Sequence, residues 1–403
     1  MDRHHSNTIY RFGAVILSLL LCIGFAGCGS AVNEESLREM MREVAEEVYE
    51  EKEAEREAAQ TDTVPEQPIQ VEVVNVNEKE TAEDPEPEEE PVSEAVPEET
   101  AEPAELTKEG GPSVHGQLRV EDGVLKDEKG QPFQLRGLST HGIGWFPDYI
   151  NQGAMQDIKN AGGNVFRVAM YTQADNGYIS NPDNSMRLVR KAIEDAKAMD
   201  LYVIVDWHIL EDGDPNAYTD RAVSFFDTIA TEYANDPAVL YELCNEPNRV
   251  EWDAIERYAY TVCAVVRQRS PNAILILGTP DYSSRLSAPL SAPFPEKNLL
   301  YAYHYYAGEH PDFSALQNAV DNHLPVFVSE WGIGKDNSGG PALSAGQTFV
   351  DYLNEKGISW CLWSLCNKDE VYSVLRPDCN KTGGFTEGDL TEVGKLAFSA
   401  MGG

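Results

Sequence analysis

Residues 239–247 read VLYELCNEP, an apolar run that ends in Asn245, Glu246 and Pro247. Residues 325–332 read PVFVSEWG, and Glu330 comes near the end of this second run. Apolar runs of this length predict strands that are buried on both faces. A carboxylate at the end of a buried strand is costly to desolvate, so such a residue usually serves chemistry rather than stability.

Eight apolar, β-rich runs alternate with helical patterns in the C-terminal part of the chain. The predicted strands are Phe133–His141, Asn164–Tyr171, Leu201–His208, Val239–Glu246, Ala273–Thr279, Leu299–Tyr306, Val326–Trp331 and Ile358–Leu365. The helical patterns between them include Met186–Met199, Arg221–Tyr233, Glu251–Arg269 and Ala345–Lys356. This alternation predicts an α/β protein, a closed (β/α)8 TIM barrel. An open doubly wound sheet is the alternative, but no glycine-rich phosphate loop follows the first strand.

The first 28 residues have the features of an export signal. Arg3 and Arg11 precede an uncharged apolar run over residues 12–27, and small residues surround Cys28. This order resembles a lipoprotein-type signal peptide (residues 1–28), in which Cys28 is lipidated after cleavage. We expect a lipid anchor at Cys28 to hold the protein at the extracellular face of a bacterial cell membrane, with plain secretion as the alternative.

Two acidic segments separate this signal from the globular part. Residues 29–60 predict an acidic amphipathic helix with an apolar stripe at Leu37, Met41, Val44 and Val48. Residues 61–113 are rich in Pro and Glu and predict a disordered linker, because their few apolar side chains cannot offset the entropy of ordering. A globular domain is predicted over residues 114–403, opening with a small hairpin around Asp122-Gly123.

The charge and the cysteines exclude several functions. The formal net charge is −37, and residues 29–113 alone hold 28 acidic and 6 basic residues. The sequence has no cluster of Lys or Arg that would neutralise phosphates, so we expect no nucleic-acid partner. Five cysteines follow the signal without a metal-binding spacing, so we predict neither metal nor cofactor. Buried free thiols are expected, with a Cys366–Cys379 disulfide as the alternative.

Polar and aromatic residues gather at the C-terminal ends of the predicted strands. In a (β/α)8 barrel these ends meet in one place, where the active site lies. The residues, in chain order, are His141, Trp145, Arg167, Tyr171, Asp206, Trp207, His208, Asn245, Glu246, Tyr282, His304, Tyr306, Glu330, Trp363 and Lys368. Strand alternation directs Trp207 and Trp331 away from the others, so for these two a place in the core is expected.

An ordered set of short motifs carries a resemblance to a known family. The motifs are STHG at 139–142, FRVAMY at 166–171, VDWH at 205–208, NEP at 245–247, HYYAG at 304–308, SEWG at 329–332 and WSL at 363–365. From about Gln117 to its end the chain resembles glycoside hydrolase family 5, most closely its bacterial endo-β-1,4-glucanases (cellulases). The resemblance covers nearly all of the predicted globular domain.

The resemblance implies a retaining, endo-acting hydrolase that cleaves β-1,4-glucosidic bonds of cellulose or related β-glucans by double displacement. Glu246 would be the acid/base and Glu330 the nucleophile. Retention requires two carboxyl groups about 5–5.5 Å apart, one protonated and one ionised. Arg167 and Tyr306 are expected to keep Glu330 ionised, whereas Glu246 has fewer partners and keeps its proton.

The same resemblance assigns the supporting residues. Asn245 would bond the 2-hydroxyl of the sugar at the cleavage point, and His208 and His304 would position the acid and the sugar. The predicted substrate-binding residues are His141, Trp145, Tyr171, Tyr282, Trp363, Lys368 and Glu370. The aromatic rings among them would stack on the flat faces of glucose, and Lys368 and Glu370 would bind a distal glucose. Tyr282 departs from the family, which commonly has Trp near that place.

Other functions stay open at this point. The same two glutamates would serve hydrolysis of mannan, xyloglucan or mixed-linkage glucan, although Lys368, Glu370 and the segment 140–142 favour cellulose-type substrates. A non-enzymatic, glycan-binding surface lipoprotein is a further alternative. The intact carboxylate pair argues against it. A monomeric catalytic domain is expected.

Overall fold

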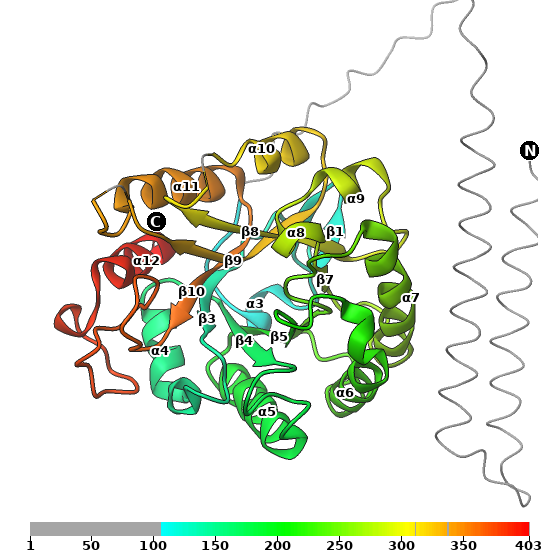
Figure 1. The fold of residues 1–403 in the computed structure, drawn as a ribbon, viewed down its shortest axis with the longest axis horizontal. Coiled ribbons are helices and arrows are strands. Elements are labelled where there is room, and N and C mark those ends of the chain that lie inside the picture. Colours follow the sequence, from blue (N-terminus) through cyan, green and yellow to red (C-terminus); the bar gives the residue numbers. More distant parts are fainter. Residues whose placement is uncertain (1–105, 311, 337, 403) are drawn as a thin grey trace, which may run out of the picture.

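The computed structural model describes residues 106–402 except residues 311 and 337 (Figure 1). The predicted signal peptide, Cys28, the acidic helix and the linker up to residue 105 lie outside the described residues. Those features therefore stay predictions. None of the helices in the described part of the chain combines the length and the apolar character that a membrane crossing requires.

Eight parallel strands close into a barrel in the order β10-β3-β4-β5-β6-β7-β8-β9. The strands are β3 (Arg136–Thr140), β4 (Val165–Tyr171), β5 (Tyr202–His208), β6 (Val239–Glu242), β7 (Leu275–Leu277), β8 (Leu299–Ala307), β9 (Val326–Ile333) and β10 (Trp360–Leu365). Each of the eight predicted runs overlaps one of them, so the predicted TIM barrel is confirmed. Strands β8 and β9 extend one and two residues beyond their predicted ends, to Ala307 and Ile333. Nearly every strand residue is buried, as strands covered on both faces require.

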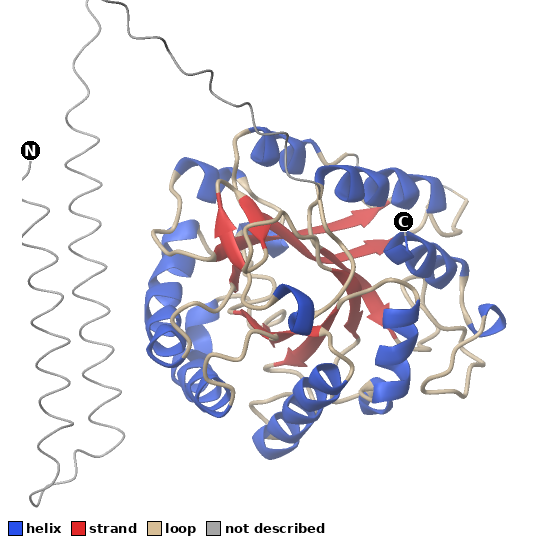
Figure 2. Cartoon of the chain, turned by 180° about the vertical axis from the view of Figure 1, so that it is seen from behind, coloured by secondary structure: helices blue, strands red, loops and turns tan. Residues whose placement is uncertain are grey.

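Helices surround the barrel on its outer side (Figure 2). The longer ones are α4 (Gln152–Asn160), α5 (Pro182–Ala198), α6 (Thr219–Glu232), α7 (Trp252–Arg269), α10 (Ser314–Asp321), α11 (Leu343–Lys356) and α12 (Glu392–Gly402). Shorter segments are α8 (Pro280–Ser283), α9 (Ser287–Ser291), η1 (Pro147–Tyr149), η2 (Pro215–Tyr218) and η3 (Glu387–Asp389). The four predicted helical patterns correspond to α5, α6, α7 and α11.

Local sequence determines where these helices begin and end. The side chain of Asn151 caps α4 by accepting a 3.0 Å hydrogen bond from the N–H of Ala154. Helix α11 ends at Lys356 and is followed by Gly357, whose φ of 67° is left-handed, a conformation that glycine adopts without steric cost. Helix α5 buries Val189, Ile193 and Ala196, a spacing that places one apolar face against the barrel.

The N-terminal end of the barrel is covered by α3 (Pro112–His115) and by an antiparallel hairpin of β1 (Arg119–Glu121) and β2 (Val124–Lys126). The predicted hairpin is confirmed, with Asp122 and Gly123 both at positive φ in its turn. The folded part begins earlier than predicted. Thr107 exchanges backbone hydrogen bonds with Pro132 and Gln134, so residues 106–113 belong to the globular domain and not to the linker.

Side chains alternate between the outside and the inside of the barrel along each strand, and this alternation directs polar groups into the active site. On β5, Trp207 points outward and is fully buried against the helices. Its inward-facing neighbours change from the apolar Ile204 in the lower barrel core to Asp206 and then His208. The C-terminal half of the barrel interior is therefore charged. The expectation that Trp207 and Trp331 belong to the core is confirmed, since both are fully buried.

The cysteines of the described residues form no disulfide. Cys244, Cys263, Cys361, Cys366 and Cys379 are all buried free thiols. The default expectation therefore holds for these five, and the alternative Cys366–Cys379 bridge is not formed.

Close packing of β3 against β4 gives a stability prediction. A Cβ placed on Gly137 would lie 1.9 Å from the carbonyl oxygen of Val165, and a strand backbone cannot yield that far. We expect Gly137→Ala to lower the free energy of unfolding by at least about 1–3 kcal/mol. Urea denaturation followed by circular dichroism measures the change. Gly388→Ala is the matched control, because its nearest neighbour lies 3.9 Å away; equal stability of the two variants would contradict the packing argument.

Candidate active site

A single buried arginine organises the C-terminal half of the barrel interior. Arg167 on β4 is fully buried and donates from Nε to Oε2 of Glu242 at 2.6 Å and from Nη2 to Oε1 of Glu242 at 3.1 Å. Its Nη2 also lies 3.0 Å from Oδ2 of Asp206. Burial alone would lower the pKa of Arg167, but Asp206, Glu242 and Glu330 raise it well above the ordinary value. The guanidinium is therefore permanently charged.

Glu330 on β9 is held by two donors. Nη1 of Arg167 donates to Oε2 at 3.0 Å, and the hydroxyl of Tyr306 donates to Oε1 at 2.6 Å. Both oxygens thus accept hydrogen bonds, as an ionised carboxylate does. The predicted partnership of Arg167 and Tyr306 with Glu330 is present.

Glu246 has a different environment. Strand β6 ends at Glu242, so Glu246 lies four residues beyond it in the loop, and the predicted strand Val239–Glu246 was too long. Oε1 of Glu246 lies 2.8 Å from Nδ1 of His304, and no ion pair joins Glu246 to Arg167 among the described residues. Burial raises the pKa of Glu246 to about 7; Arg167 opposes this shift and Glu242 adds to it. Glu246 can therefore hold a proton near neutral pH.

The two glutamates face each other at short range. One carboxylate oxygen of Glu246, one of Glu330 and a ring nitrogen of His304 all lie within 4.8 Å of one another. This separation is close to that of retaining glycosidases and well below the roughly 6.5–9.5 Å that an attacking water needs between the carboxyls of an inverting site. The site therefore pairs one proton-holding and one ionised carboxyl across a gap that fits direct attack.

These three groups have the spacing of a metal site, but their chemistry does not favour one. Glu330 already accepts from Arg167 and Tyr306, and Glu246 is bonded to His304. A cation here would also lie close to the guanidinium of Arg167, which repels it. We therefore interpret Glu246, His304 and Glu330 as a carboxylate pair with a histidine partner and not as a set of metal ligands.

Asn245 and His208 complete the floor of the site. Arg167 Nη2 donates to Oδ1 of Asn245 at 2.6 Å, which fixes the amide with its Nδ2 toward Ile209 O and His208 Nε2, at 3.0 and 3.4 Å. Burial lowers the pKa of His208 well below the ordinary value, and Arg167 adds to this. The ring is therefore neutral, and its Nδ1 donates to Oδ2 of Asp206 at 2.6 Å.

A cleft of about 460 Å³ adjoins the site, and its lining includes His208 and Tyr306. Its wall includes six of the seven predicted substrate-binding residues, namely His141, Trp145, Tyr171, Trp363, Lys368 and Glu370. The Trp145 ring packs edge-on to Tyr171 at 4.8 Å, and the Trp363 ring is stacked nearly parallel to His208 at 5.3 Å. Trp145 remains 40% exposed, so its ring face is available to a flat, uncharged ligand.

The polar end of the cleft is formed by a triad of side chains. Lys368 Nζ lies 2.6 Å from Oε2 of Glu370, and His141 Nε2 lies 3.4 Å from Lys368 and 3.7 Å from Glu370. Burial, together with Lys368 and His208, lowers the pKa of His141 to about 4. His141 is therefore neutral at pH 7. Its Nδ1 accepts from the N–H of Gly142 at 2.7 Å, so Nε2 is the nitrogen that faces Lys368 and Glu370.

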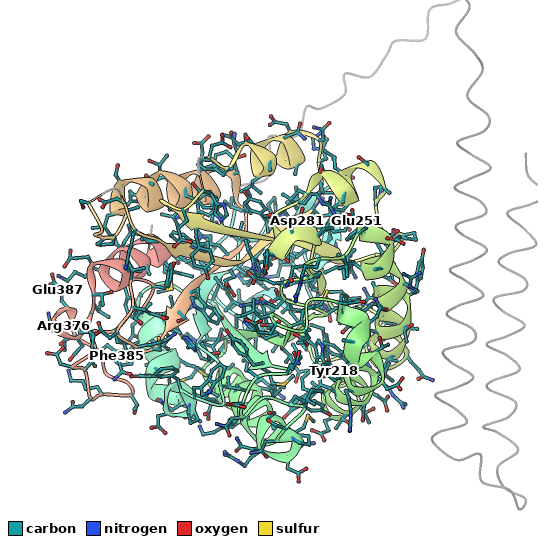
Figure 3. The ribbon with its side chains drawn as sticks, in the orientation of Figure 1. Tyr218, Glu251, Asp281, Arg376, Phe385 and Glu387 are labelled. Carbon is teal, nitrogen blue, oxygen red and sulfur yellow. The ribbon has the colours of Figure 1, made fainter. Side chains whose placement is uncertain are left out.

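Tyr282 is set apart from the cleft wall. It lies in α8 and is 51% exposed. Its N–H donates to the carbonyl of Pro247 at 3.0 Å, beside Glu246. Asp281, Tyr282 and Ser283 all have left-handed φ values, of 57°, 60° and 55°. Arg285 pairs with Asp281 and Glu251, and these two labelled acids lie side by side in Figure 3.

Comparison with known proteins identifies the family. The model described as "Cellulase (glycosyl hydrolase family 5)" matches residues 126–369. The chain belongs to glycosyl hydrolase family 5. This family membership confirms the resemblance that the motifs indicated.

Relatives within glycosyl hydrolase family 5 include several endoglucanases. The chain is 44% identical over 289 residues to endoglucanase N of Pectobacterium atrosepticum and to endoglucanase 5 of Pectobacterium carotovorum subsp. carotovorum, covering 70% of this chain in each case. It spans 65% and 57% of the length of these two relatives. Among solved structures, the catalytic domain of Thermobifida fusca endoglucanase Cel5A is 34% identical, with a TM-score of 0.68, over 72% of this chain and 99% of that domain.

Sequence reasoning missed Glu242 and Ser329 as parts of this family 5 site. Glu242 accepts from Arg167, and Ser329 donates to Oε1 of Glu242 at 2.7 Å. A usable signal existed, since Glu242 interrupts the apolar run of β6 at a position in register with Asp206. A carboxylate inside a buried strand requires a buried cation. Glu309 and Tyr372 also line the cleft and were not predicted.

Removal of the central cation gives a second stability prediction. Arg167→Ala leaves Asp206 and Glu242 buried without a counter-ion, so we expect the free energy of unfolding to fall by about 3–5 kcal/mol. The pKa values of both carboxyls, already raised by burial, then rise further. Between pH 5 and pH 8 the folded variant keeps protons on these carboxyls that the unfolded chain has already released, so its free energy of unfolding falls as the pH rises. The loss relative to the wild type is therefore larger at pH 8 than at pH 5.

Denaturant unfolding at both pH values measures this dependence. Arg190→Ala is the control, because Arg190 pairs with Glu232 at 2.6 Å on the surface, where ion pairs contribute about 0–1 kcal/mol. A loss for Arg167→Ala that is as small as the control, or that is independent of pH, would contradict the assigned role.

Proposed function

We propose that this protein is a retaining, endo-acting glycoside hydrolase that cleaves β-1,4-glucosidic bonds of cellulose or related β-glucans. One observation carries the proposal: Glu246 and Glu330 lie within 4.8 Å in opposite protonation environments. Of these two carboxylates only Glu330 accepts from Arg167, whereas burial raises the pKa of Glu246 to about 7. A protonated acid and an ionised nucleophile at this separation are the requirements of double displacement.

The geometry supports a two-step mechanism. Glu330 attacks the anomeric carbon, the glycosidic C–O bond breaks, and Glu246 delivers its proton to the leaving oxygen. The glycosyl ester removes the negative charge of Glu330 from the site. Glu246, now ionised, takes a proton from a water molecule whose oxygen attacks the anomeric carbon, and the bond to Glu330 breaks. Tyr306 and Arg167 stabilise the departing carboxylate, to which both donate.

The cleft chemistry favours an uncharged sugar chain. Trp145, Tyr171 and Trp363 supply apolar ring surface on its wall, and Lys368 and Glu370 supply hydrogen-bonding groups at one end. Glucose presents C–H faces that pack on such rings and equatorial hydroxyls that bond such groups. In support, the relatives are named endoglucanases, and a variant of the Thermobifida fusca domain was solved with cellotetraose.

A substrate panel tests the proposed specificity. Initial rates of reducing-end release are measured on carboxymethylcellulose, mixed-linkage β-glucan, mannan and xyloglucan. We expect the β-1,4-glucan substrates to be cleaved at least tenfold faster than mannan, on the order of the 1–3 kcal/mol that a misplaced hydroxyl costs. A rapid fall in viscosity for few bonds cleaved is expected of endo action. Fastest cleavage of mannan, or slow loss of viscosity, would contradict the proposal.

Azide rescue tests the two carboxylate roles separately. In Glu330→Ala the small anion occupies the nucleophile's side of the sugar, so an activated aryl cellobioside should yield the glycosyl azide of inverted configuration. In Glu246→Ala azide should attack the glycosyl ester from the opposite side and yield the azide of retained configuration. Proton NMR of the products distinguishes the two anomers. The reverse pattern would show that the two roles are exchanged, and identical configuration from both variants would contradict the proposed pair.

Leaving-group dependence provides the matched control. Glu246→Ala should lower kcat/KM about 10²–10⁴-fold on cellotetraose, whose leaving alkoxide needs a proton. It should lower kcat/KM much less on the aryl substrate, whose phenolate leaves unaided. An equal loss on both would remove the acid role from Glu246.

A further inference from the structure

A buried hydrogen-bond chain connects the central ion pair to the proposed acid. It runs from Oε1 of Glu242 to Oγ of Ser329 at 2.7 Å, from Oγ to Nε2 of His304 at 3.1 Å, and from Nδ1 of His304 to Oε1 of Glu246 at 2.8 Å. All four residues are at most 8% exposed. The chain joins β6, β9 and β8 to the loop that carries Glu246.

Glu242 determines which atom is the donor in each hydrogen bond of this chain. We call this donor-to-acceptor order the direction of the chain. Both oxygens of Glu242 accept N–H groups of Arg167, at 2.6 and 3.1 Å. Burial raises the pKa of Glu242 and Arg167 opposes that shift. The bidentate guanidinium pair requires two acceptor oxygens, so Glu242 is ionised and acts only as an acceptor.

Ser329 passes this direction on. A serine hydroxyl has one hydrogen, and Ser329 donates it to Glu242. Only a lone pair of Oγ then faces Nε2 of His304. His304 must carry its hydrogen on Nε2.

His304 determines which partner is the donor in the hydrogen bond to Glu246. Burial lowers the pKa of His304 to about 4, so its ring is neutral and has a single N–H. With that hydrogen on Nε2, the Nδ1 atom is an acceptor. Oε1 of Glu246 can satisfy it only by donating. The carboxyl of Glu246 must therefore hold a proton.

We propose that Glu242 and Ser329 are positioning residues that impose the Nε2–H tautomer on His304 and thereby keep the free enzyme loaded with a proton on Glu246. The inference rests on the proposed function, because it deepens the acid role of Glu246. The same direction serves the second step: when Glu246 has lost its proton, its oxygen faces the lone pair of Nδ1. That repulsion favours recovery of a proton from the attacking water.

Other titratable groups also face Glu246 and must be held constant in a test. They are Arg167 and Tyr171 on β4, Asp206 on β5, Tyr306 on β8 and Glu330 on β9. None of them bonds to Ser329 in the described structure. Ser329→Ala therefore changes the direction of the chain and leaves these groups in place.

The tautomer itself is measured on the full-length protein by long-range ¹H–¹⁵N NMR with labelled histidine, using His304→Gln to assign the signals. We expect the wild type to show His304 hydrogen on Nε2. Ser329→Ala should transfer it to Nδ1, where it can donate to an ionised Glu246. Glu242→Gln should do the same, because the amide can donate to Ser329. An Nδ1–H tautomer in the wild type would overturn the proposal. This readout needs no turnover, so it stands apart from the test of function.

Kinetics supply the functional readout. In Ser329→Ala we expect the acid dissociation constant of Glu246 to rise about tenfold, so the upper limb of the kcat/KM profile on cellotetraose moves to lower pH. Because the pKa of Glu246 is about 7 in the wild type, kcat/KM at pH 7 should fall about fivefold. The loss on the aryl cellobioside should be smaller, and Ser329→Thr, which keeps the hydroxyl, should restore the profile.

The matched control is Ser139→Ala. Ser139 is equally buried and its Oγ accepts from Arg167 at 3.2 Å, but it does not reach His304. This variant should keep the Nε2–H tautomer and the position of the upper limb. An unshifted upper limb in Ser329→Ala, or the same shift in Ser139→Ala, would refute the positioning role.

Discussion

The burial of one guanidinium among three carboxylates is the constraint on which the site depends. Arg167 lies inside the barrel and contacts Asp206, Glu242 and Glu330 from three different strands. Such a cluster is costly to desolvate, and it persists because nearly every donor of the guanidinium finds an acceptor. The barrel closure makes this possible, since β4, β5, β6 and β9 direct their inward side chains to one axis.

The different roles that we propose for the two glutamates follow from their access to that cation. Glu330 is on a strand and receives a direct hydrogen bond from Arg167, so its charge is stabilised. Glu246 is on a loop and meets a neutral imidazole instead, so its proton is stabilised. Two identical side chains thus acquire opposite roles from their surroundings alone. Glu242 links the two environments, because it contacts both Arg167 and Ser329.

The sequence predicted the barrel and most of the site because each strand corresponds to an apolar run that ends in polar residues. It did not predict where β6 ends, because Leu243 and Cys244 continue the apolar pattern after the chain has left the sheet. Glu242 and Ser329 were missed since their importance lies in contacts between strands far apart in sequence. Residues 106–113 were assigned to the linker by their composition, yet backbone hydrogen bonds at Thr107 attach them to the barrel.

The turn at Asp281, Tyr282 and Ser283 has a consequence for the evolution of this protein. Three successive non-glycine residues in the left-handed region cost on the order of 1–2 kcal/mol each. Bonds from Tyr282 to Pro247 and from Ser283 to Asn245 offset that cost and join the turn to the loop bearing Glu246. Glycine at position 282 would relieve the backbone and keep the bonding N–H, whereas glycine at position 283 would remove the hydroxyl that bonds Asn245. Only at Ser283, therefore, does relief of the backbone come at the cost of the attachment to the loop that carries Glu246.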